Sequence, residues 1–128
     1  VVGTDTDAIL LDLRQHLDHL GFEDVIISQE NQVAFKATRQ DANNIWVQKV
    51  VNSLEKGAGR PVHLLPNLAG SLPNECFTQA LGLTTIWIPH SYRQCSQHAP
   101  NEHMPERLFF SALTLMAKLF SDLGSENS

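Results

Sequence analysis

Apolar residues recur at intervals of three and four near the start of the chain, at Leu10, Leu13, Leu17 and Leu20. This spacing places one apolar stripe along a helix. The polar residues 5–7 offer N-caps before the stripe, and Gly21 follows it where a helix commonly ends. The pattern therefore predicts an amphipathic helix in this part of the chain.

Three further helices are predicted downstream. One begins near residue 45, ends at residues 57–59 and has a broad apolar face: Ile45, Trp46, Val47, Val50, Val51 and Leu54. A short helix from Ser71 to about Leu81 is indicated by a Ser cap, an early Pro and a Glu soon after it. The last begins at residues 105–106, ends at Gly124 and carries Leu108, Phe109, Ala112, Leu115, Met116, Leu119 and Phe120.

Short runs rich in β-branched and other apolar residues separate these helices and predict strands, at residues 24–29, 33–38, 61–65 and 84–88. From residue 44 onward, helices and strands alternate, a pattern typical of α/β layers. The sequence thus predicts an α/β fold, a partial layered sheet flanked by helices. A helix–strand element of α+β type precedes it.

Composition excludes several classes of protein. The 128 residues contain 42% hydrophobic residues, enough for one globular core. Net charge is −5 and the nine basic residues are dispersed, so we expect no nucleic-acid partner. No apolar run approaches a membrane span and no signal peptide opens the chain, so we expect no membrane association. Cys76 and Cys95 form no disulfide framework, which indicates reduced thiols and a cytoplasmic protein.

The residues from His90 to Met104 form the most unusual stretch. This loop holds three histidines, a cysteine and a carboxylate, and packing does not explain such a composition. His98 is followed by Glu102 and His103, and imidazole with carboxylate suits zinc. The spacing leaves three interpretations open: a complete local site, one ligand of a site completed elsewhere, or an ordinary structural loop.

A second candidate lies at Gly70 and Ser71, just before the predicted short helix. Free backbone amides and the helix dipole at such a turn bind anions, although an ordinary capped helix has the same sequence. Both candidate segments follow a predicted strand and precede a helix. In open α/β sheets that edge binds ligands, so we expect one shared site.

Four segments carry a resemblance to a known family: residues 67–74, 81–84, 88–92 and 96–103. In order and spacing they resemble the C-terminal part of the zinc aminoacylase/carboxypeptidase family, which includes acetylornithine deacetylase, succinyl-diaminopimelate desuccinylase and glutamate carboxypeptidase. The resemblance extends from about residue 36 to residue 123. It implies that residues 1–35 end a lid or dimerisation domain. Residues 36–128 would be the C-terminal portion of the catalytic α/β domain.

The resemblance also implies roles for individual residues. His98 would bind zinc, of which the enzyme would hold one ion or two, while Asn101 and Glu102 would support that ligand. Gly70 and Ser71 would face the substrate, although Ala69 stands where the family usually has a first glycine. It implies no role for His90, Cys95 or His103.

The activity implied is hydrolysis of an N-acyl-amino-acid or peptide amide bond by a metal-activated water. Residues 1–65 contain nothing that matches the family's remaining ligands or its general base, so the chain alone is expected to be inactive. A start without Met leads us to expect a piece of a longer protein, whose missing N-terminal half would be its partner. The alternative is a non-catalytic structural or dimerisation module, and either is expected to form homo-oligomers through exposed apolar surface.

Overall fold

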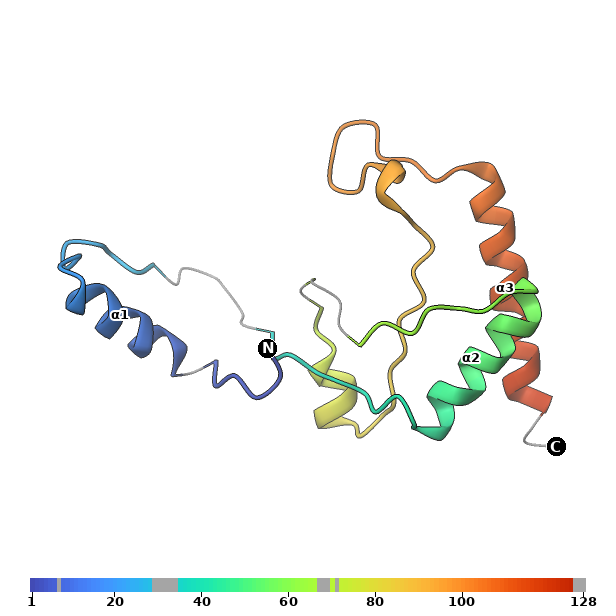
Figure 1. Cartoon of the computed structure of the whole chain (residues 1–128), viewed down its shortest axis with the longest axis horizontal. Coiled ribbons are helices and arrows are strands. Elements are labelled where there is room, and N and C mark those ends of the chain that lie inside the picture. The colour runs from blue at the N-terminus through green and yellow to red at the C-terminus, as the bar shows by residue number, and fades with distance from the viewer. Residues whose placement is uncertain (7, 29–34, 67–69, 71, 126–128) are drawn as a thin grey trace. The chain divides into compact units, whose positions relative to one another are not determined.

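The structure is a computed structural model that describes residues 1–6, 8–28, 35–66, 70 and 72–125 (Figure 1). Three α-helices carry most of its regular structure: α1 (Ile9–His19), α2 (Ile45–Ala58) and α3 (Glu106–Ser125). A π-helical turn, η1 (Cys76–Ala80), and a 3₁₀ turn, η2 (Arg93–Cys95), lie between α2 and α3. The three long helices confirm the predictions made from apolar spacing.

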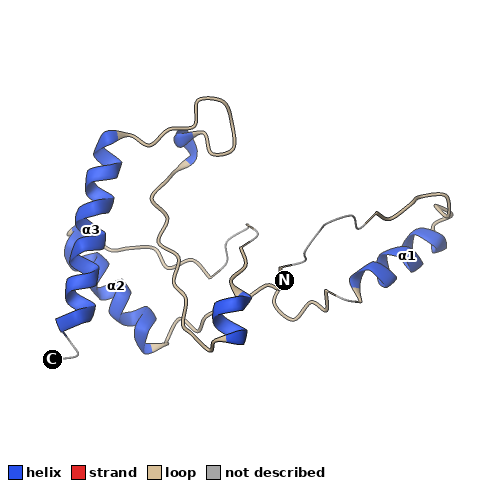
Figure 2. Cartoon of the chain, turned by 180° about the vertical axis from the view of Figure 1, so that it is seen from behind, coloured by secondary structure: helices blue, strands red, loops and turns tan. Residues whose placement is uncertain are grey.

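The predicted α/β fold is wrong: the described ranges contain helices and loops and no strand (Figure 2). Residues 24–28, 35–38, 61–65 and 84–88 are loops, while residues 29–34 of the predicted strands lie outside the described part. A strand exists only when a neighbouring segment completes its hydrogen-bond ladder. A β-branched run carries no information about that neighbour.

The segment after α1 shows what takes the place of a ladder there. The Arg14 guanidinium donates hydrogen bonds to the backbone carbonyls of Phe22 and Val25, the first at 2.9 Å. It also pairs with Asp18 on the same helix. The Val25 carbonyl, which a partner strand would have bound, is therefore held by a side chain of α1.

The chain divides into two compact units, the first comprising Val1–Arg39 and Asn67–Thr85, the second Gln40–Pro66 and Ile86–Ser128. The predicted domains, 1–35 and 36–128, stay a prediction. In the first unit, α1 begins where Asp5 Oδ1 accepts the Ala8 N–H, and it buries none of its residues. Its apolar stripe is therefore accessible to solvent within this unit.

All buried side chains among the described residues lie in the second unit. There α2 packs against α3 and buries Val47, Val50, Ser53, Ala112 and Leu119. At the start of α2, Asn44 Oδ1 accepts the Trp46 N–H at 2.9 Å, which satisfies an amide that the helix leaves without a partner. Gly59 ends α2 with φ 65°, a conformation that glycine adopts without a Cβ clash.

Of the described helices, α3 is long and apolar enough to cross a membrane by length and composition. The core helix of a soluble protein passes the same test. Here one face of α3 packs on α2, and that face carries Lys118 and Asp122. The helix gives no specific indication of a membrane.

Candidate functional site

The loop from His90 to Met104 is anchored in its middle by a buried thiol. Cys95, at the end of η2, is 2% exposed, and its N–H donates to the Tyr92 carbonyl at 2.9 Å. The thiol is free. Cys95 therefore has a packing role, which sequence composition alone did not distinguish from a chemical one.

Three residues after this anchor adopt left-handed backbone conformations: Ser96 (φ 54°), His98 (φ 59°) and Asn101 (φ 64°). Such conformations are uncommon for residues with a Cβ, although Asn and His tolerate them better than most. They turn the chain sharply, so that residues 96–103 fold back on themselves.

Hydrogen bonds hold the folded loop closed. The Ala99 N–H donates to the Ser96 carbonyl at 3.0 Å, and the His103 N–H donates to the Cys95 carbonyl at 3.0 Å. The ring nitrogen Nδ1 of His103 lies 2.9 Å from the Asn101 carbonyl oxygen. The loop is thus tied back to its buried anchor at both ends of the turn.

The predicted zinc ligand, His98, lies at the exposed tip of this turn. Its backbone N–H donates to Glu102 Oε2 at 3.3 Å, a long hydrogen bond that accompanies the left-handed backbone of His98. Glu102 therefore contacts His98 through the main chain. Asn101 contacts His103 through its backbone carbonyl, and the roles predicted for Asn101 and Glu102 in supporting the His98 ligand stay predictions.

The donors in this loop do not make up a complete zinc site. Among the described residues no three His, Cys, Asp or Glu side chains are grouped closely enough to hold a metal ion. A structural zinc ion takes four protein ligands and a catalytic one takes three. The loop accordingly offers exposed imidazoles rather than a closed set of ligands, and zinc binding stays a prediction.

The predicted substrate segment is described only in part. Gly70 is exposed, whereas Ser71 lies outside the described residues. The helix expected from Ser71 to Leu81 is shorter, because η1 spans only Cys76–Ala80. Five residues separate Gly70 from that turn, so the described helix does not begin at the glycine as the anion-site hypothesis requires.

Asn74 organises the start of η1, which sequence reasoning did not anticipate. Its Nδ2 donates to Thr38 Oγ1 at 2.7 Å, and its carbonyl accepts the N–H groups of Phe77 and Thr78. Buried Asn74 Oδ1 and Glu75 Oε2 find no hydrogen-bond partner in the described structure.

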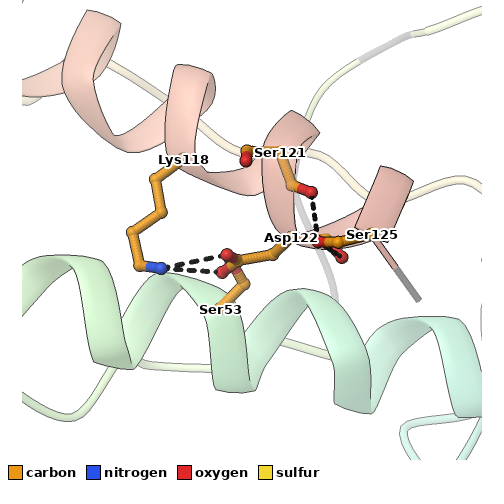
Figure 3. A network of polar contacts seen from close by, with 5 residues as sticks. All are labelled: Ser53, Lys118, Ser121, Asp122 and Ser125. Carbon is orange, nitrogen blue, oxygen red and sulfur yellow. Dashed lines mark hydrogen bonds and ion pairs between the residues drawn. The ribbon is translucent and has the colours of Figure 1, made fainter. Parts of the chain in front are cut away.

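A carboxylate with a lowered pKa, Asp122, lies between α2 and α3 in the second unit (Figure 3). The Ser53 hydroxyl donates to Asp122 Oδ2 at 2.6 Å, and the Lys118 ammonium donates to both carboxylate oxygens at 3.0 Å. These contacts, Ser53 first, lower the pKa of Asp122 below its ordinary value of 3.8. The i,i+4 spacing of Lys118 and Asp122 was the sequence signal for it.

No protein-family model, curated protein or solved structure matches this chain. The resemblance to the zinc aminoacylase/carboxypeptidase family therefore stays a prediction that rests on the quoted motifs.

Proposed function

We propose that this chain contributes one zinc ligand, His98, to an enzyme that hydrolyses an N-acyl-amino-acid or peptide amide bond. Gly70 and Ser71 would contact the substrate. The remaining ligands and the general base would come from residues outside these 128. The proposal keeps the cytoplasmic assignment, which two cysteines without a disulfide framework favour.

One observation carries the proposal: the loop that bears the family resemblance is closed by its own hydrogen bonds while the His98 side chain stays exposed. An exposed imidazole on a fixed backbone is available to a ligand set completed from another part of a protein. A fixed backbone also reduces the conformational entropy that metal binding would otherwise cost.

The residues of this chain would bind and orient, and would not act as acid or base. Glu102, by accepting the His98 N–H, favours the backbone conformation from which the imidazole projects. When bound, zinc supplies Lewis-acid chemistry to hydrolytic enzymes. The described donors do not complete a zinc site, so the isolated chain is expected to be inactive.

A second candidate function is a non-catalytic structural or dimerisation module. Large apolar side chains on α3 favour it, because Phe109, Leu113 and Phe120 are 50%, 57% and 71% exposed. Apolar surface of this kind commonly marks a protein interface.

Hydrolysis assays separate the two candidates. The chain would be assayed with zinc, alone and joined to any further residues that its gene encodes, against N-acyl-amino-acids and dipeptides. We expect activity only in the joined form. His98→Ala should lower kcat/KM by about 100-fold or more, since even residues that only support metal ligands often contribute 10–100-fold.

His63→Ala is the matched control, because His63 is also exposed and lies in the same unit. Activity equal in the joined protein and the His98→Ala variant would contradict the proposal. Joined protein with no hydrolysis of any of these substrates would favour the structural module.

A further inference from the structure

We draw no further inference here: the strongest candidate, the exposed apolar face of α3 around Phe109, Leu113 and Phe120, carries nothing beyond the module already described, because nothing in the structure shows what covers it.

Discussion

The hydroxyl of Ser53 on α2 donates a 2.6 Å hydrogen bond to the Asp122 carboxylate on α3, so a polar contact joins the two helices beside their apolar core. Ser53 is only 5% exposed. A buried hydroxyl that lost this acceptor would pay its desolvation cost without compensation. The contact therefore links the register of α2 and α3 to one charged side chain.

The pH dependence of stability should report this contact. Hydrogen bonds from Ser53 and then Lys118 hold the pKa of Asp122 below 3.8. A lowered folded pKa gives stability that is fully present above the ordinary value and is lost as pH falls through the folded pKa. Thermal unfolding between about pH 7 and about pH 2 should show this loss.

Asp122→Asn should reduce the free energy of unfolding at neutral pH, and that free energy should then fall less as the pH is lowered. Glu106→Gln, at an exposed position of the same helix, is the control and should keep the full loss of stability at acid pH. If Asp122→Asn and the unaltered chain lost the same stability at acid pH, the contact would not control stability.

At Gly57 on α2, an added Cβ would lie 2.9 Å from Leu115 Cδ2 and 3.3 Å from Lys118 Cδ on α3. Both atoms belong to flexible side chains, and alanine is better than glycine in a helix by about 1 kcal/mol. Gly57→Ala should therefore be close to neutral. Gly57→Val should lower the free energy of unfolding by about 1–3 kcal/mol, because a branched side chain overpacks the contact. Denaturant titration of the two variants measures the difference, and equal midpoints would refute it.

The N-cap of α2 should contribute measurably to its stability. Asn44→Ala removes the acceptor of the Trp46 N–H and should cost about 1 kcal/mol in denaturant titration. Asn43→Ala is the matched control, because Asn43 bonds through its backbone, to Asp41 Oδ1. A cost that is the same in both variants would mean that the cap is not the source.

The exposed apolar side chains of α3 should cause the chain to self-associate. We expect oligomers in analytical ultracentrifugation at roughly tens of micromolar, with dissociation in a Leu113→Lys/Phe120→Lys double variant. Ser121→Lys adds a charge to the same helix without removing apolar surface and should remain oligomeric. A monodisperse monomer of the unaltered chain would contradict the prediction.

Helices were predictable from the sequence because their hydrogen bonds and their apolar periodicity are both local. The end of α2 at residues 57–59 and the apolar stripe on α3 needed no knowledge of distant residues. The four predicted strands failed for the opposite reason, since a strand depends on a partner elsewhere. At Val25 the decisive partner is Arg14, whose role no periodicity reveals.

The same distinction between local and non-local information applies to the candidate site. The composition of residues 90–104 indicated a loop that carries chemistry, which stays a prediction, and the structure shows that hydrogen bonds close this loop. What the sequence could not supply is the backbone geometry: the Glu102 contact with the His98 N–H and the Asn101 carbonyl that orients His103. Such contacts involve main-chain atoms, which every residue has, so residue types do not predict them.

The left-handed residues of the loop have a consequence for protein engineering. Glycine adopts such a backbone freely, whereas other residues lose roughly 1 kcal/mol each. At Asn101 only the carbonyl is used to orient His103, and glycine retains that carbonyl. Ser96 and Asn101 are thus positions at which a more robust version of the loop could be made with all of its imidazoles intact.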